Sequence, residues 1–407
     1  MRGRRWRGLQ WGASALLVIA ATSACLLTAP EPHARSSTDE PALRRWNLLA
    51  IGAPAAWARG AAGQGQLIAI VDSGIDLDHP DLSARVRAGV DCIGTGGDPA
   101  RCRGTGADVD GHGTHVAGIA AATAPEAGLL AIRVLDEACA GGPCRAVGRA
   151  GDVAAGIEWA TASGADVINL SVDTVDGSLA GPRVARAVDG AWAAGVVVVA
   201  AAGSRTADGT VAQPSLVVTA TDRWGGLADY AHSAARSPWS LAAPGGSSGA
   251  DPACADDDRP GVRSAWIGGG YRCLTGTSMA APHVAGSVAV LRSLGYGPGA
   301  AVDRLIGSAR AIRADGRAGV GTLDLAAASG PAPVIDPVVG WPSRALASET
   351  GRIDPFGETG GVAEVLPPVL GGAVIGLCGA VALLVLRDLR RASRRRRRAQ
   401  SLAMASS

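Results

Sequence analysis

The chain has 407 residues, too many for one small domain and enough for two average domains or one large α/β domain with appendages. Hydrophobic residues make up 47% of it and aromatic residues only 3%, and it contains no lysine. A formal net charge of +2 is too small to indicate a partner of either sign, so the distribution of charge along the chain matters more than its sum.

The N-terminal segment, residues 1–29, is typical of a secretory signal peptide. Four arginines precede an apolar run from Ala13 to Ala29. A retained membrane anchor is the alternative, and the small residues at the end of the run favour cleavage. Residues 30–44 follow as a short N-terminal extension that is too small to form a domain.

Short apolar runs alternate with segments of helical period between residues 45 and 330. The runs lie at 66–71, 129–135, 166–172 and 196–201, and such runs suit strands buried on both faces of a parallel sheet. Segments 151–164 and 181–195 between them have helical length and period. This alternation predicts an α/β fold with a central, mostly parallel sheet and with ligand sites at the carboxyl ends of its strands.

Three motifs in this region carry residues with catalytic chemistry. Asp72 directly follows a predicted strand in IAIVDSGID, and His112 lies between two glycines in GHGTHVAGIAA. For each alone, a turn-forming aspartate or a packed histidine is the simpler interpretation. Ser278 lies in TGTSMAAPHVAG, ahead of apolar residues at helical spacing, and Pro282 indicates that a helix begins nearby.

We expect Ser278 to lie at the N-terminus of a buried helix. That end of a helix has unpaired N–H groups and the positive end of the helix dipole, which suits chemistry that creates an oxyanion. A serine that merely caps the helix is the alternative.

The C-terminal part divides into three segments. Residues 331–364 are rich in proline, glycine and polar residues, which predicts a tether. Residues 365–386 form an uncharged apolar run long enough to span a bilayer core of about 30 Å. Residues 387–407 begin with eight arginines within fourteen residues, which predicts a cytoplasmic tail and a main domain outside the membrane. Nucleic-acid binding is the alternative, but a basic run directly after an apolar segment favours contact with anionic lipid.

Six cysteines lie outside the two apolar segments, in a region where the predicted location permits disulfides. Their spacing suggests three local pairs, although six cysteines allow fifteen pairings: Cys92 with Cys102, Cys139 with Cys144, and Cys254 with Cys273. A zinc site is the alternative, but no CxxC motif with histidine partners occurs. No other cluster has metal-ligand spacing, so the sequence predicts no metal site and no cofactor.

The three motifs occur in the order Asp, His, Ser, which is the order of the subtilisin-type triad. VDSGID, GHGTHVAG and GTSMAAPHVAG resemble the subtilases, the subtilisin-like serine proteases, over roughly residues 45–330. The resemblance implies a three-layer α/β fold and a serine endopeptidase that acts by acyl transfer. It implies that His112 takes the proton of Ser278 and returns it to the leaving amine, while Asp72 holds the ring in the right tautomer.

The resemblance also implies which residues contact the substrate. An extended substrate would pair with NLSVD (169–173), and AAAG (200–203) would line the specificity pocket. The substrate-binding residues are then Leu170, Ser171, Val172, Ala201 and Gly203.

Two departures from the subtilase pattern concern the cleft. Subtilases usually carry an asparagine after AAAG as the second oxyanion donor, and this chain has Ser204 there. We expect the oxyanion hole to comprise the backbone N–H of Ser278 and the side chain of Ser204. Because the serine side chain is shorter than that of asparagine, its donation should be weaker, which predicts a slow protease. NLSVD also lacks the glycine expected soon after NLS, a change expected to alter the substrate cleft.

The layout of the chain resembles the mycosins, the membrane-anchored subtilases of actinobacterial type VII secretion systems. This resemblance implies a polypeptide substrate, a single-pass location in the cell membrane with the protease domain outside, and a secretion complex as partner, with no nucleic acid. Two hypotheses remain: a working endopeptidase, favoured by the complete triad, and a catalytically weak or inactive structural subunit, for which Ser204 and the tether leave room.

Overall fold

The computed structural model describes residues 45–138, 145–172, 181–203, 215–231, 239–252, 254, 261–312 and 318–331. The chain divides into two units, Met1–Arg344 and Ala345–Ser407, and all described residues belong to the first. The predicted signal peptide, short extension, membrane segment and tail lie outside the described residues, as does the tether apart from residue 331. No helix within the described ranges is long and apolar enough to cross a membrane.

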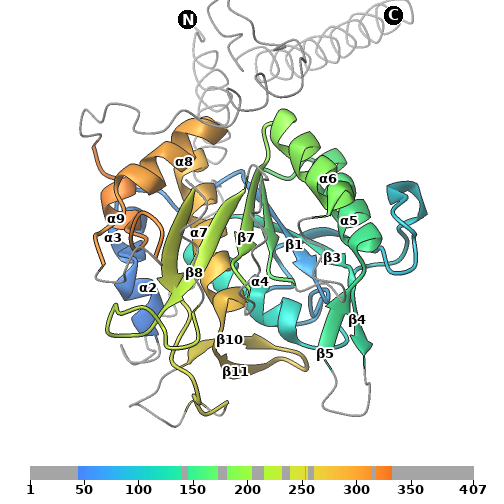
Figure 1. Ribbon diagram of the computed structural model, residues 1–407, viewed down its shortest axis with the longest axis horizontal. Helices are drawn as coiled ribbons and strands as arrows, with labels where there is room; N and C mark the ends of the chain where they lie inside the picture. Colours follow the sequence, from blue (N-terminus) through green and yellow to red (C-terminus); the bar gives the residue numbers. More distant parts are fainter. Residues whose placement is uncertain are drawn as a thin grey trace, which may run out of the picture. The chain divides into compact units, whose positions relative to one another are not determined.

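A seven-stranded sheet forms the centre of the fold, in the order β2-β3-β1-β6-β7-β8-β9, and all neighbouring pairs are parallel (Figure 1). Its strands are β1 (Leu67–Asp72), β2 (Val86–Asp91), β3 (Gly128–Arg133), β6 (Val167–Leu170), β7 (Val197–Ala201), β8 (Leu216–Thr221) and β9 (Ser240–Pro244). The four predicted apolar runs correspond to β1, β3, β6 and β7, which confirms the parallel α/β architecture. Because Val71 is in register with Leu170, the carboxyl ends of β1 and β6 bring Asp72 and Ser171 to the same edge of the sheet.

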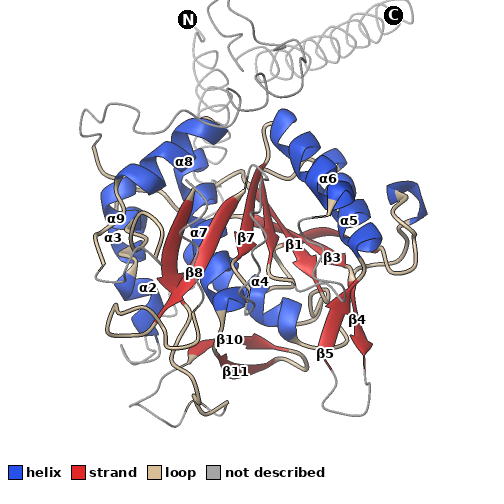
Figure 2. Ribbon diagram, in the orientation of Figure 1, coloured by secondary structure: helices blue, strands red, loops and turns tan. Residues whose placement is uncertain are grey.

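Helices cover both faces of the sheet. Successive side chains of a strand point to opposite faces, so each strand contributes to two hydrophobic cores. On β1, Ile68 and Ile70 join the core with helices α4 (His112–Thr123) and α7 (Thr277–Ser293). Ala69 and Val71 join the second core with α5 (Ala150–Ala162) and α6 (Pro182–Ala193). Figure 2 shows α5 and α6 side by side next to the red strands, and these are the two helices that the sequence predicts at 151–164 and 181–195.

The first and last described segments form a layer of short helices. They are α2 (Trp46–Ala50), α3 (Ala53–Trp57), α8 (Pro298–Gly307) and α9 (Leu325–Ala328), with α3 and α8 both against α9. Asn47 Nδ2 donates to Nε2 of the buried His283 in α7 at 2.8 Å. Arg304 donates to the carbonyls of Ala328 and Gly330 at 2.6 Å each. The first contact ties the start of the described chain to α7, and the second ties its end to α8.

Two hairpins and one 3-10 turn complete the described structure. Strands β4 (Leu135–Ala138) and β5 (Arg145–Gly148) form one hairpin, and η2 (Pro99–Arg101) follows β2. Strands β10 (Val262–Trp266) and β11 (Gly270–Leu274) form the other, which packs along α4 (Figure 1). Since β11 ends at Leu274 and α7 begins at Thr277, the second hairpin leads directly to Ser278.

Candidate active site

Asp72 is the last residue of β1 and is fully buried. Its Oδ1 accepts hydrogen bonds from Nδ1 of His112 at 2.7 Å and from the backbone N–H of Ser73 at 2.8 Å. Burial raises the pKa of Asp72, while the charge of His112 and these hydrogen bonds act in the opposite direction. The carboxylate fixes the tautomer with the proton on Nδ1 of His112, which leaves Nε2 to accept a proton.

His112 is the first residue of α4, and its side chain is 25% exposed, so the ring is open to a substrate. Gly111 before it has φ +107°, and a Cβ there would lie 2.6 Å from the ring of Trp266. Burial disfavours the charged ring, but the Asp72 carboxylate outweighs this and raises the pKa of His112 to about 9, with smaller contributions from Asp110 and Asp108. The pair thus stabilises the imidazolium that a general base becomes.

Ser278 is the second residue of α7, at the N-terminus of a helix whose interior is almost wholly buried, as the sequence predicts. Its backbone N–H is in the first turn, where a helix supplies no intrahelical acceptor. That N–H is therefore available to an oxyanion. Gly276 precedes the helix with φ +148°, a conformation that favours glycine at this sharp entry.

Ser171 and Pro282 set the position of Ser278. Proline has no N–H, so Pro282 cannot donate to the carbonyl of Ser278 four residues earlier. Ser171 Oγ donates to that carbonyl instead, at 3.0 Å, and itself accepts from Asn169 Nδ2 at 2.9 Å. Ser278 Oγ donates in turn to the carbonyl of Ser171 at 3.5 Å.

Among the described residues, Ser278 Oγ makes no hydrogen bond to the ring of His112. Catalytic hydrogen bonds of this kind are often long before a substrate binds and shorten in the reacting complex. The three residues come from β1, α4 and α7, and two of them, Asp72 and His112, are already hydrogen-bonded.

A cavity of about 210 Å³ adjoins Ser278. It is lined by Val172, Ala201, Gly203, Tyr230, Thr275, Gly276, Thr277 and Ser278. The structure therefore brings three of the predicted substrate-binding residues to the nucleophile. Leu170 lies instead in the core between the sheet and α5 and α6, and Ser171 contacts Ser278.

Tyr230 is a residue of this cavity that the sequence analysis missed. Its hydroxyl lies 2.8 and 3.0 Å from the carbonyl oxygens of Gly245 and Gly246 and donates its one proton between them, which fixes the ring at the cavity wall. The only sequence signal is an aromatic residue in a chain that has three tyrosines, and that signal does not point to a site. Ser204, the predicted second oxyanion donor, lies outside the described residues.

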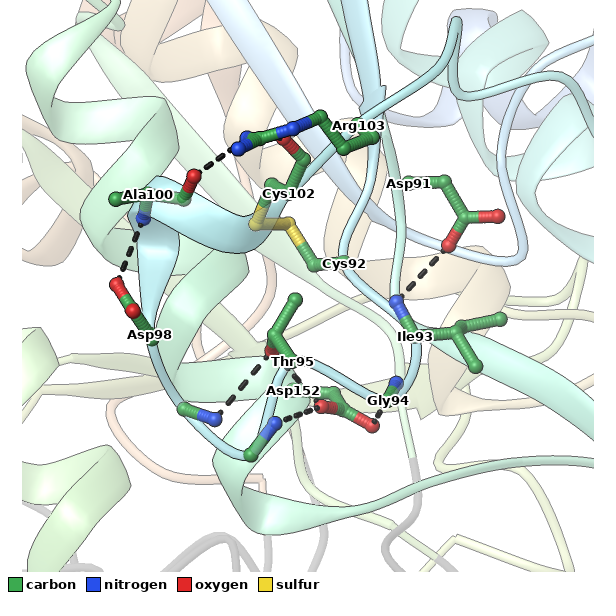
Figure 3. The surroundings of a disulfide bond; sticks show 12 residues. Asp91, Cys92, Ile93, Gly94, Thr95, Asp98, Ala100, Cys102, Arg103 and Asp152 are labelled. Carbon is green, nitrogen blue, oxygen red and sulfur yellow. Dashed lines mark hydrogen bonds between the residues drawn. A yellow bond between two sulfur atoms is a disulfide. The ribbon is translucent and has the colours of Figure 1, made fainter.

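Disulfides join Cys92 to Cys102 and Cys254 to Cys273, two of the three predicted local pairs. Cys139 and Cys144 lie outside the described residues. Figure 3 shows the first disulfide, which closes the loop after β2. In the described part of the chain, no group of three or more histidine, cysteine, aspartate or glutamate side chains is arranged to hold a metal ion.

The model of the subtilase family matches residues 63–313, so the chain belongs to the subtilase family. Thermitase from Thermoactinomyces vulgaris is 37% identical over 266 residues, which cover 62% of this chain and 83% of thermitase.

Two further relatives are covered less completely. A thermophilic serine proteinase from Bacillus sp. (strain AK1) is 36% identical over 256 residues, 59% of this chain and 55% of that protein. Subtilisin E from Bacillus subtilis is 35% identical over 265 residues, 61% of each protein.

A solved protease from Pseudoalteromonas arctica superposes with a TM-score of 0.59 at 27% identity, covering 70% of this chain and 96% of that one. The fold is thus the subtilisin-like α/β fold.

Proposed function

We propose that the protein is a serine endopeptidase that uses Asp72, His112 and Ser278 as its triad. Ser278 Oγ attacks the peptide carbonyl and passes its proton to Nε2 of His112, which then donates it to the leaving amine. The backbone N–H of Ser278 stabilises the developing oxyanion. Asp72 orients the ring and stabilises its charged form. The acyl intermediate on Ser278 is released by water in a second step that repeats these roles.

The observation that carries this proposal is the 2.7 Å hydrogen bond between Asp72 and His112, in a chain whose Ser278 lies at the start of α7 beside a cavity. Replacing Ser278 with alanine should abolish hydrolysis of a peptide substrate by the purified full-length protein. The fold should survive, because a small residue is acceptable at the start of the helix. Hydrolysis that persists in Ser278→Ala would show that another residue is the nucleophile.

We further propose that the enzyme is anchored in the cell membrane and associated with type VII secretion, like the mycosins. The order of segments supports this: an apolar N-terminal run, the subtilase region, a proline-rich stretch, an uncharged run at 365–386 and an arginine-rich end. The polypeptide substrate would then be met outside the membrane, close to the secretion complex.

A structural subunit with weak or no activity is the second candidate function, and Ser204 is the observation that favours it. Loss of one oxyanion donor typically costs roughly 10²–10³-fold in kcat. Replacing Ser204 with asparagine should raise kcat at least about tenfold and leave KM nearly unchanged, because this interaction forms in the transition state. If kcat does not rise in a folded Ser204→Asn protein, either Ser204 is not at the oxyanion site or the protein already fills that site in another way.

A further inference from the structure

Asp108 accepts hydrogen bonds from five donors, although it touches neither Asp72 nor Ser278 in the described contacts. It lies in the loop before α4, next to Ala107, which pairs with Ile75 in the loop after β1. Its Oδ1 accepts from the Ser73 hydroxyl at 2.8 Å and from the backbone N–H groups of Asp110 and Gly111 at 3.0 Å each. Its Oδ2 accepts from the backbone N–H and the hydroxyl of Thr114, at 2.9 and 2.5 Å.

These donors belong to the two segments that carry the hydrogen-bonded pair of the triad. Ser73 directly follows Asp72, and Thr114 lies two residues after His112. The Ser73 hydroxyl, which donates to Asp108, also accepts from the backbone N–H of Gly113 at 2.9 Å. One carboxylate therefore fastens the loop after β1 to the first turn of α4.

The two segments approach so closely that small errors in their relative position would matter. A Cβ on Gly113 would lie 2.2 Å from the carbonyl oxygen of Gly74. Thr114 Oγ1, held by Asp108, also accepts from the backbone N–H of Asp76, so the contact continues along the loop after β1. The hydrogen bond between Asp72 and His112 spans this same junction.

We propose that Asp108 is a positioning residue for the triad: by bonding Ser73 and Thr114 with its two oxygens, it sets the distance and angle at which Asp72 meets His112. This inference rests on the proposed peptidase activity. A displacement of about 1 Å at reacting groups is enough to cost roughly 100-fold in rate, so a carboxylate that never contacts substrate can act strongly on kcat.

The substitution Asp108→Asn distinguishes the bond to Ser73, after β1, from the bonds to Thr114, in α4. The amide oxygen still accepts from Ser73 and from the two loop N–H groups. The amide nitrogen faces the N–H of Thr114, donor against donor, so this bond is lost and only the Thr114 hydroxyl can still bond the side chain, as an acceptor. Asp108→Ala removes both links.

Asp152 provides the matched control. It is a buried carboxylate that accepts from the N–H of Gly94 at 3.0 Å, from that of Gly96 at 3.3 Å and from the hydroxyl of Thr95 at 2.9 Å (Figure 3). It thereby holds a loop to the start of α5, and among the described residues it makes no hydrogen bond to Asp72, His112 or Ser278. Asp152→Asn should therefore lower stability without a specific effect on turnover.

The experiment compares Asp108→Asn, Asp108→Ala and Asp152→Asn in the purified full-length protein. Melting temperatures are measured first, and kcat and KM for a peptide substrate are then measured at a temperature where the wild type and all three variants are folded. The titration of His112 is followed by NMR of ¹³C-histidine, assigned with a His112→Gln sample. The charges around His112 are Asp72, Asp110 and Asp108, and burial lowers the pKa of the neighbouring His115 to about 3.

We expect both Asp108 variants to lose at least about tenfold in kcat with KM changed by less than about twofold, and His112 to titrate at lower pH. Asp152→Asn should keep the kcat and the His112 titration of the wild type. Asp108 variants that keep kcat within about twofold of wild type, or lose no more than Asp152→Asn, would overturn the proposal. If the wild type itself hydrolyses no peptide, the proposed function fails, and the His112 titration still decides. Both Asp108 variants remove the same charge, which by itself lowers the pKa of His112, so only a further fall in Asp108→Ala reports a displaced pair; equal titrations in Asp108→Asn and Asp108→Ala would overturn the positioning role.

Discussion

The carbonyl of Ser278 is held by a side chain rather than by the helix it begins. Pro282 withholds the usual donor, and Ser171 Oγ replaces it at 3.0 Å. Truncating Ser171 to alanine leaves that carbonyl and Asn169 Nδ2 without this partner, which should cost roughly 1–3 kcal/mol of unfolding free energy. Because Ser278 would lose its anchor, kcat should fall as well.

Ser287→Ala is the control for Ser171→Ala. In the wild type, the Ser287 hydroxyl donates to the carbonyl of His283 at 2.7 Å in the interior of α7, away from the nucleophile. Denaturant unfolding and peptide hydrolysis should show a loss of stability in both variants and a loss of kcat only in Ser171→Ala. Equal kcat in the two variants would contradict a role of Ser171 in placing Ser278.

The state of His112 predicts the dependence of activity on pH. A general base works only in its neutral form, and the Asp72 carboxylate raises the pKa of His112 to about 9 despite its burial. kcat/KM should therefore rise with pH through the neutral range and level off only near pH 9. A profile that is already flat at pH 7 would mean that the charge of Asp72 acts on His112 less strongly than the geometry implies.

At the scale of elements, the continuous apolar strands are the part of the fold that the sequence predicts best. β1, β3, β6 and β7 lie at the centre of the sheet and are covered on both faces, so their hydrophobic runs are unbroken. β2 is an edge strand with the mixed sequence VRAGVD and exposed positions. β9 lies at the other edge of the sheet and ends in Pro244, which weakens a strand pattern.

The site divides in a similar way. Asp72, His112 and Ser278 are found from sequence because their three motifs, each ambiguous alone, occur together in the order of the subtilisin-type triad. The place of Tyr230 in the cavity and the hydrogen bonds of Asp108 to Ser73 and Thr114 depend on segments brought together only by folding. The pairing of Ile75 with Ala107, for example, has no signature in either stretch.

The disulfide between Cys254 and Cys273 is the clearest test at this scale. It fastens residue 254 to β11, the strand that leads to Ser278, and closes a loop of 19 residues in sequence separation. In the chain-entropy model, such a loop contributes about 3 kcal/mol. The double variant Cys254→Ala and Cys273→Ala should lose about this much in denaturant unfolding. Non-reducing peptide mapping that found these cysteines free in the wild type would remove the basis of the prediction.

At the scale of the whole molecule, the proposed anchor predicts which parts of the chain are accessible. If residues 365–386 cross the membrane and the arginine-rich end stays inside, protease added to intact cells should remove the subtilase region and leave a small membrane-bound stub. Antibodies against epitopes in 45–330 and in 387–407 would follow the two parts. Protection of residues 45–330 in intact cells, with cleavage after lysis, would contradict the proposed topology.

The central claim is that Asp72 and His112 activate Ser278 as a nucleophile, and covalent labelling tests it most directly. The full-length protein is treated with a fluorophosphonate probe over a range of pH, and the modified peptide is identified by mass spectrometry. We predict a single labelled site at Ser278, a rate that rises with pH toward the pKa of His112 near 9, and no labelling in Asp72→Asn within the same time. A folded wild-type protein that remains unlabelled, or that is labelled at another serine, would contradict the account.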